Sequence, residues 1–188
     1  ETDEELPAVG NLAAASAKGA PTVWHEVRDN IVAQKEFGDR AAVEEAFSKA
    51  DHITRLDLTN NRLVGNAMEP RTVICEYDKK TGRRIIRIGH QRPNNLLESI
   101  TDIFGEDPDK FRVIVEDIGG GFGIKNMTYP EDVVIVYASG NLKRDIRWRG
   151  SRTEDFQATG HGRYQINHAE LACSADGKIL GMRLHNLG

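Results

Sequence analysis

Residues 111–123 read FRVIVEDIGGGFG, so a largely apolar stretch runs directly into four glycines within five positions. The first part, residues 111–118, predicts a strand. Glycine has no Cβ, so the run that follows can adopt positive φ angles and present bare backbone N–H groups to a polar ligand. The pattern predicts either a ligand-binding loop or a structural turn after a buried strand, and the glycines alone favour neither.

Two standard phosphate-binding motifs do not fit this loop. A P-loop requires Gly-Lys followed by Ser or Thr five residues after its first glycine, whereas Ile124 stands there and Lys125 precedes Asn126. A dinucleotide-binding fingerprint that began at Gly119 or Gly121 would need glycine at position 124 or 126, and we expect no βαβ unit upstream. The sequence thus excludes both motifs in their usual form.

The glycine loop is one of several motifs that follow one another in order. The others are NAMEPR at residues 66–71, GHQRP at 89–93, RWRGSRTEDF at 147–156, TGHGR at 159–163, AELA at 169–172 and DGKILG at 176–181. In this order and at these intervals they closely resemble the molybdenum-cofactor-binding (large) subunit of the xanthine oxidase, aldehyde oxidase and carbon monoxide dehydrogenase family. The resemblance runs from about residue 20 to Gly188 and covers the N-terminal part of the cofactor-binding region only.

The resemblance implies a molybdenum-dependent oxidoreductase. Members of the family hydroxylate an aldehyde or an N-heterocycle, or oxidise carbon monoxide, with water as the source of oxygen. The implied cofactor is a molybdopterin-type molybdenum cofactor in the cytosine dinucleotide form, and partner subunits carry iron–sulfur clusters and FAD. Two alternatives stand beside this interpretation: a non-catalytic fragment or assembly module that retains the fold, and a different nucleotide-binding enzyme.

The resemblance also assigns cofactor-binding roles to five residues. Gln91 matches the glutamine whose amide reaches an oxo ligand of molybdenum, where a neutral donor stabilises charge without losing a proton. Phe122 and Gly123 match the Phe-Gly pair whose backbone lies against the metal's other oxygen ligand. Gly120 and Gly121 keep that approach open. The alternative for Phe122 is a core aromatic side chain beside a glycine-rich turn.

Other motif positions carry further expectations. Asn126 stands where purine-hydroxylating members place a glutamate in the substrate pocket, which argues against a purine substrate. Glu69 and Arg71 are expected to form a structural carboxylate–guanidinium pair. No residue of the chain is expected to ligate the metal directly, because the cofactor supplies most ligands and the 6 histidines show no ligand spacing.

The catalytic residue of the family lies elsewhere. In the relatives the general base is a glutamate near the C-terminus of a much longer subunit. We therefore expect it on polypeptide beyond Gly188, and we expect the isolated chain to be inactive. The implied partners are the remaining part of the large subunit, an iron–sulfur subunit, a flavin subunit and a small-molecule substrate.

Composition bounds the class of protein. The chain has 188 residues, of which 39% are hydrophobic, and a formal net charge of -4 with both signs interspersed. We therefore expect a globular domain that binds neither nucleic acid nor a membrane surface. No stretch approaches the roughly 18 apolar residues of a membrane span, and the acidic residues 1–5 are unlike a signal peptide, so a cytoplasmic protein is expected. Cys75 and Cys173 are expected as buried free thiols.

The hydrophobic periodicity predicts an α+β fold with a mixed, hairpin-rich sheet and packed helices, and the resemblance implies the molybdopterin-binding domain of the molybdenum hydroxylases. Helices are predicted at residues 39–50, with Asp39 as the N-cap candidate, at 95–104, ended by Gly105, and at 130–142, with Pro130 in the first turn. Strands are predicted at 52–58 (half-buried), 71–77, 84–89, 111–118, 163–174 and 178–186, and the turn residues at 78–82 and 175–178 predict that the second and third strands, and the last two, form hairpins. In the last of these helices the predicted core positions are Val133, Val134, Val136 and Tyr137. Residues 1–21 are expected to link to a preceding small domain, and residues 22–188 to form a partial molybdenum-cofactor-binding domain.

Overall fold

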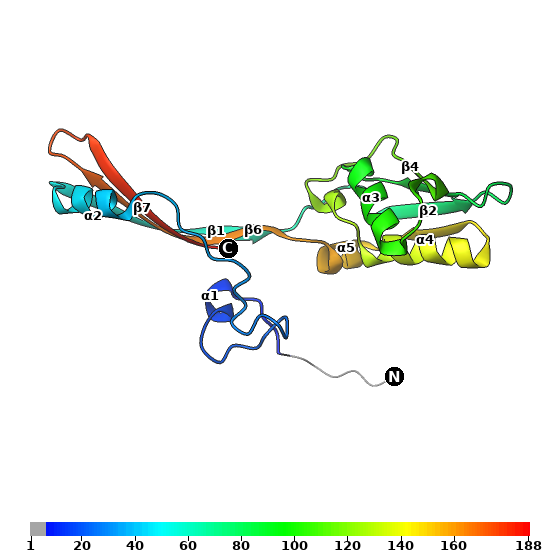
Figure 1. Cartoon of the computed structure of the whole chain (residues 1–188), viewed down its shortest axis with the longest axis horizontal. Coiled ribbons are helices and arrows are strands. Elements are labelled where there is room, and N and C mark those ends of the chain that lie inside the picture. The colour runs from blue at the N-terminus through cyan, green and yellow to red at the C-terminus, as the bar shows by residue number, and fades with distance from the viewer. Residues whose placement is uncertain (1–6) are drawn as a thin grey trace. The chain divides into compact units, whose positions relative to one another are not determined.

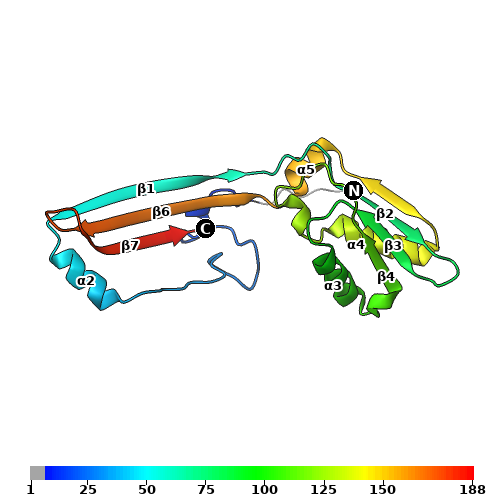
Figure 2. The same cartoon turned by 90° about the horizontal axis from the view of Figure 1, so that it is seen from above.

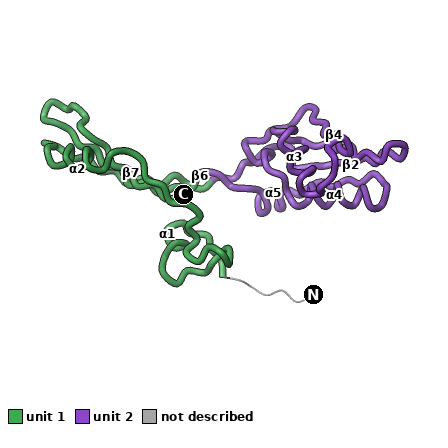
Figure 3. Tube along the Cα trace, viewed as in Figure 1, with its two compact units in different colours: residues 1–62, 163–188 green, residues 63–162 purple. Residues whose placement is uncertain are grey.

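The computed structural model describes residues 7–188, which fall into two compact units (Figure 3). Unit 1 contains the described residues up to Arg62 together with Arg163–Gly188, and unit 2 contains Leu63–Gly162. Within residues 7–188 no helix has both the length and the apolar character needed to cross a membrane. The acidic residues 1–5, on which the signal-peptide argument rested, lie outside the described part.

Unit 2 is built on a four-stranded mixed sheet in the order β4-β3-β2-β5 (Figures 1 and 2). Its strands are β2 (Thr72–Tyr77), β3 (Arg84–Ile88), β4 (Phe111–Ile114) and β5 (Ile146–Arg149). β2 runs antiparallel to both β3 and β5, which confirms the predicted β2–β3 hairpin. β3 and β4 are parallel and are joined through α3 (Pro93–Phe104), so they form a βαβ unit. The expectation that no βαβ unit precedes the glycine loop was therefore wrong.

The core of unit 2 lies between this sheet and two helices, α3 and α4 (Pro130–Leu142). Its buried members come from β2, β3, β4 and both helices: Val73, Cys75, Ile86, Leu96, Ile100, Phe111, Ile135 and Val136. Gly105 ends α3 in the left-handed conformation at φ 62°, as the sequence predicted. Cys75 is a buried free thiol, whereas Cys173 is only half-buried.

The face that α4 buries differs from the prediction. Val136 is buried and Val133 packs against the core, but Val134 and Tyr137 are 60% and 57% exposed. The buried stripe is Asp132, Ile135, Val136 and Ser139. Its spacing of i, i+3, i+4 and i+7 is helical, but two of its members are polar, so hydrophobicity alone identified Val133 and Val136 correctly and selected Val134 and Tyr137 wrongly.

Three other elements depart from the predictions. β4 ends at Ile114 and not near residue 118, because its partner β3 ends at Ile88 and offers no further backbone groups. β5 and α5 (Arg152–Ala158) were not predicted. The motif Ser151-x-x-Glu154 was a usable signal for α5, since the two residues form a capping box at its start.

Unit 1 contains a three-stranded sheet in the order β1-β6-β7. The strands are β1 (His52–Leu63), β6 (Gly162–Cys173) and β7 (Ile179–Leu187), and the predicted β6–β7 hairpin is present. α2 (Arg40–Ser48) is capped by Asp39, as expected, and packs on β7, where Gly181 faces Ala46 and Phe47. β1 is longer and more exposed than the half-buried strand predicted. Among the described residues before α2 there is one short helix, α1 (Leu12–Ala15).

Candidate functional site

The glycine loop and Gln91 meet at one edge of the sheet of unit 2. Gln91 follows β3 and the loop follows β4, and the two parallel strands end side by side. The Gln91 N–H donates to the carbonyl oxygen of Lys125 at 2.8 Å. In return the Gly123 N–H donates to Oε1 of Gln91 at 3.0 Å. The fold therefore brings together residues that lie 32 positions apart in the chain.

Gly121 provides the space that the Gln91 side chain occupies. A Cβ at Gly121 would lie 2.4 Å from Oε1 and 2.5 Å from Cδ of Gln91. Gly120 has a φ of 95°, and a Cβ there would meet the Phe122 ring at 3.3 Å. The close approach of loop and amide therefore depends on glycine at these positions.

We call the glycine loop (residues 119–123) and the Gln91 amide that packs against it the glycine cradle, or Gln91 cradle. The exposed side of this cradle carries neutral polar groups and an exposed aromatic ring. Oε1 of the exposed Gln91 is engaged by Gly123, while Nε2 makes no hydrogen bond within residues 7–188. Phe122 is 76% exposed with a φ of 48°, so the core-aromatic alternative was wrong. Asn126 is half-buried at the end of a short 3-10 turn, η2 (Ile124–Asn126), and its N–H donates to the Gly123 carbonyl.

Glu69 and Arg71 are not paired with each other, contrary to expectation. The Glu69 carboxylate accepts from Nζ of Lys125 at 2.6 Å and from the Gly119 N–H at 2.9 Å. The hydrogen bond from Lys125 holds the pKa of Glu69 below its usual range, against the opposing effect of partial burial. The contacts of the Glu69 side chain are therefore with the glycine loop and with Lys125, which follows it.

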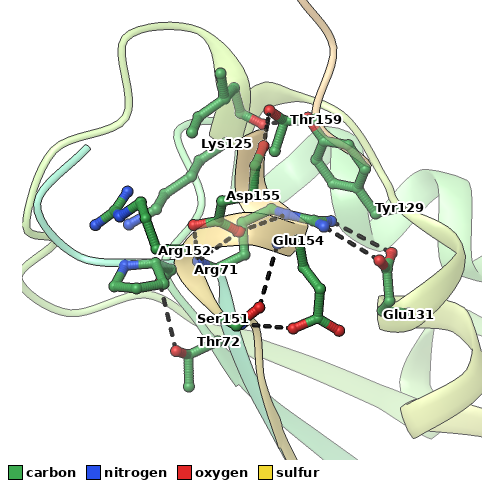
Figure 4. A network of polar contacts seen from close by, with 12 residues as sticks. Arg71, Thr72, Lys125, Tyr129, Glu131, Ser151, Arg152, Glu154, Asp155 and Thr159 are labelled. Atoms are coloured by element: carbon green, nitrogen blue, oxygen red, sulfur yellow. Dashed lines mark hydrogen bonds and ion pairs between the residues drawn. The ribbon is translucent and has the colours of Figure 1, made fainter. Parts of the chain in front are cut away.

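Arg71 is the centre of a separate buried network (Figure 4). Its guanidinium contacts the Asp155 carboxylate at 3.4 Å and Glu131 at 3.1 Å, and it lies 3.9 Å from the centre of the Tyr129 ring. The backbone N–H of Arg71 donates to Asp155 at 3.1 Å. Tyr129 in turn donates its hydroxyl hydrogen to the Ile124 carbonyl at 2.6 Å. The network thus ties α5, α4 and the end of the glycine loop together.

Two buried titratable groups flank this network. His90 accepts from the Arg92 N–H through Nδ1 and donates through Nε2 to the Met127 carbonyl, and burial lowers its pKa, so the ring is neutral. Burial raises the pKa of Asp132 to about 6, against the opposing hydrogen bond from the Tyr129 N–H and the charge of Arg71. Neither group points to a metal: residues 7–188 contain no cluster of three or more His, Cys, Asp or Glu suited to a metal ion.

Asp132 gives a pH-dependent prediction. A pKa raised in the folded state means that the fold favours the protonated form, so this contribution to stability is present below about pH 4 and is lost as the pH rises through 6. Asp132→Asn keeps an acceptor for the Tyr129 N–H without the charge. We expect the variant to exceed the wild type by about 2 kcal/mol in free energy of unfolding at pH 7.5, and to match it near pH 4.

Urea unfolding followed by circular dichroism at both pH values measures this difference. The exposed Asp102→Asn, on α3, serves as the matched control and is expected to leave the free energy of unfolding unchanged. A stability difference between the Asp132 variant and the wild type that stays constant from pH 4 to 7.5 would contradict the assignment.

Sequence reasoning selected Gln91 and the glycines but missed the side chains that brace them. Lys125 was used only to exclude a P-loop, and Arg152 and Asp155 were no more than parts of a motif. A lysine two residues after the last glycine of the loop, with a carboxylate in an accompanying motif, was the available signal for the Glu69–Lys125 pair. The arrangement as a whole offers a glycine cradle with uncharged N–H donors, which fits a bound group that presents oxygen atoms.

Comparison with known proteins agrees with this geometry. Residues 23–188 match the family described as molybdopterin cofactor-binding domain. The chain is 32% identical to the nicotine 6-hydroxylase large subunit of Paenarthrobacter nicotinovorans, over 92% of this chain and 21% of that protein. It is 30% identical to the carbon monoxide dehydrogenase large chain of Afipia carboxidovorans, over 98% of this chain and 24% of that protein.

A solved structure shows the same fold. Reconstituted CO dehydrogenase from Oligotropha carboxidovorans superposes with a TM-score of 0.87 at 29% identity, over 97% of this chain and 24% of that one. The chain thus spans about a fifth to a quarter of the length of the relatives that it matches. These matches confirm the resemblance carried by the motifs and the α+β fold predicted from the hydrophobic periodicity. The chain therefore belongs to the molybdopterin cofactor-binding domain family, which it shares with the large subunits of molybdenum hydroxylases.

Proposed function

We propose that this chain is part of the large subunit of a molybdenum hydroxylase and contributes one wall of its cofactor site. The reaction is the oxidative hydroxylation of an aldehyde or an N-heterocycle, or the oxidation of carbon monoxide, with water as the oxygen source. Asn126, in place of the glutamate of purine-hydroxylating members, supports a substrate other than a purine. When bound, the cofactor supplies the redox centre that accepts two electrons from the substrate.

The observation that carries this proposal is the glycine cradle around Gln91. Oε1 of Gln91 is fixed by the Gly123 N–H, so the amide plane is held and Nε2 is left to donate outward. Gly121 leaves the space that the Gln91 side chain fills, and Phe122 presents its exposed ring beside Gly120. We assign to Gln91 the role of a neutral donor to an oxygen of the bound group, and to Phe122 and Gly123 that of a backbone contact.

The wider assignments follow from the family. We propose the cytosine dinucleotide form of the cofactor, an iron–sulfur subunit and a flavin subunit as partners, and a cytoplasmic location. The general base and the remaining cofactor loops are assigned to other parts of the large subunit. Residues 22–188 are proposed as a partial cofactor-binding domain and residues 1–21 as its linker.

Two substitutions at Gln91 test the proposal in the complete complex. Gln91→Ala removes the whole amide, whereas Gln91→Glu keeps an acceptor for the Gly123 N–H, replaces the N–H donors by an acceptor oxygen and adds a negative charge. Both are expected to lower turnover by about 100-fold, as for the loss of one preorganised donor, while the melting temperature stays unchanged. Turnover per bound molybdenum and the molybdenum content are the quantities to measure.

Gln157→Ala, on the exposed surface of α5, is the matched control and is expected to behave as the wild type. Unchanged turnover in both Gln91 variants would exclude the assigned role. That result would favour the alternative, a non-catalytic fragment or assembly module that retains the fold.

A further inference from the structure

Lys125 is a charged side chain that the fold buries almost completely. Only 1% of the side chain is exposed, and its Nζ lies 2.6 Å from Oε2 of Glu69. Nζ also lies beside Gly89 at the end of β3, where an added Cβ would be 3.5 Å away. An ammonium group in such a place is costly unless a carboxylate compensates it. Lys125 therefore depends on Glu69.

One oxygen atom of Glu69 holds both ends of the glycine loop. Oε2 accepts from the N–H of Gly119, where the loop begins, and from Nζ of Lys125, where it ends. The Glu69 N–H also donates to the Gly119 carbonyl at 3.1 Å. A Cβ at Gly119 would lie 2.6 Å from Cβ of Glu69, so the two segments are in direct contact. The carboxylate thus closes the loop as a clamp.

The segment that carries Glu69 is itself fixed from its other side by α5. Arg152 donates to Oδ1 of Asn66 and to the carbonyl of Met68, both at 2.9 Å. Asp155 accepts from the backbone N–H of Arg71 at 3.1 Å. Residues on both sides of Glu69 are therefore anchored to one helix, which fixes the backbone that carries the carboxylate.

The clamp extends to Gln91 through the backbone. The carbonyl of Lys125 accepts the Gln91 N–H, and the Gly123 N–H fixes the Gln91 side chain. A movement of Lys125 would therefore displace both contacts that orient the amide. We propose that Glu69 and Lys125 are positioning residues that set the glycine loop against Gln91 for cofactor binding, an inference that rests on the function proposed above.

The experiment uses the complete complex with Lys125→Met, Glu69→Gln and the double variant. Complex purified from cells that cannot make the pterin is used to measure amide hydrogen exchange of the ligand-free loop. Complex purified from cells that make the pterin is used to measure the molybdenum content. In the single variants we expect residues 119–126 to exchange about tenfold faster or more, with β2 exchange unchanged, and the molybdenum content to fall. The exposed pair Glu45–Lys49 on α2, altered to Gln and Met, is the matched control and should change neither quantity.

The order of effects distinguishes a clamp from two separate contacts. Glu69→Gln should be the most damaging change, because it leaves the Lys125 ammonium buried without a partner charge. The double variant should be milder than Glu69→Gln alone, because it removes that stranded charge. We expect these two rankings of the variants both for the rate of loop exchange and for the loss of molybdenum.

Two results would overturn the positioning role. One is loop exchange that stays at the wild-type rate in both single variants. The other is an equal increase in the hydrogen-exchange rates of the loop and of β2, which would mean a general loss of stability. A wild-type complex without molybdenum would contradict the proposed function instead, and the exchange of the ligand-free loop would still decide the role of the pair.

Discussion

Gly121→Ala is expected to lower turnover of the complete enzyme by about 100-fold while leaving the fold intact, because an ångström-scale misplacement of a positioning group has effects of this size. The added Cβ would overlap Oε1 and Cδ of Gln91, at 2.4 and 2.5 Å. Gly121 does not have a positive φ, so alanine is compatible with its backbone. The flexible Gln91 side chain is the part that must move, and the substitution therefore tests the placement of the amide.

Turnover, molybdenum content and melting temperature of the variant measure these effects. Gly10→Ala is the control, since a Cβ there has nothing within 4 Å. We expect a change in melting temperature of less than about 3 °C for both variants, since a ΔΔG of 1 kcal/mol shifts it by a few degrees. Full activity in Gly121→Ala would mean that the Gln91 position is irrelevant to the reaction.

Arg71→Met is expected to produce the largest loss of stability, about 3–5 kcal/mol in free energy of unfolding. The change removes the guanidinium from between Asp155 and Glu131 and leaves the Asp155 carboxylate, only 3% exposed, without its cation. Methionine roughly preserves the volume, so the lost charge pairing is the main cause. Denaturant unfolding of the chain measures this loss.

Two further variants separate charge from packing. The double variant Arg71→Met with Asp155→Asn should recover part of the loss, because the stranded charge is gone. Arg40→Met breaks an exposed pair with Glu36 and is expected to leave the free energy of unfolding close to that of the wild type. A loss below about 1 kcal/mol for Arg71→Met would show that the network contributes little.

Local signals in the sequence predicted the elements that depend on them. The β2–β3 hairpin, the α3 stop at Gly105 and the α4 start at Pro130 all rest on turn or capping chemistry within a few residues. The burial of α4 was predicted less well, because two polar side chains are buried with hydrogen-bond partners: Asp132 accepts from the Tyr129 N–H at the start of the same helix, and Ser139 donates to the Cys75 carbonyl on β2. Hydrophobicity cannot anticipate a buried polar stripe.

Long-range pairing accounts for what the sequence did not reveal. The parallel alignment of β3 with β4 and the docking of β5 on β2 depend on backbone partners far along the chain. Glu69 meets Lys125 across 56 positions, and Arg71 meets Asp155 across 84. Proximity in the chain suggested a Glu69–Arg71 pair, and the fold separates them into two networks. Gln91 and the glycines were found because their motifs resemble a known family.

We propose that the Gln91 cradle forms part of a molybdenum cofactor site. The most direct test is the molybdenum and phosphorus content of the natively purified complete complex, with the intact mass of each co-purifying chain. We expect molybdenum in stoichiometric amount in the wild type and a clear loss in Gly121→Ala. A fully folded wild-type complex without molybdenum, from cells in which another molybdenum hydroxylase is loaded, would contradict it.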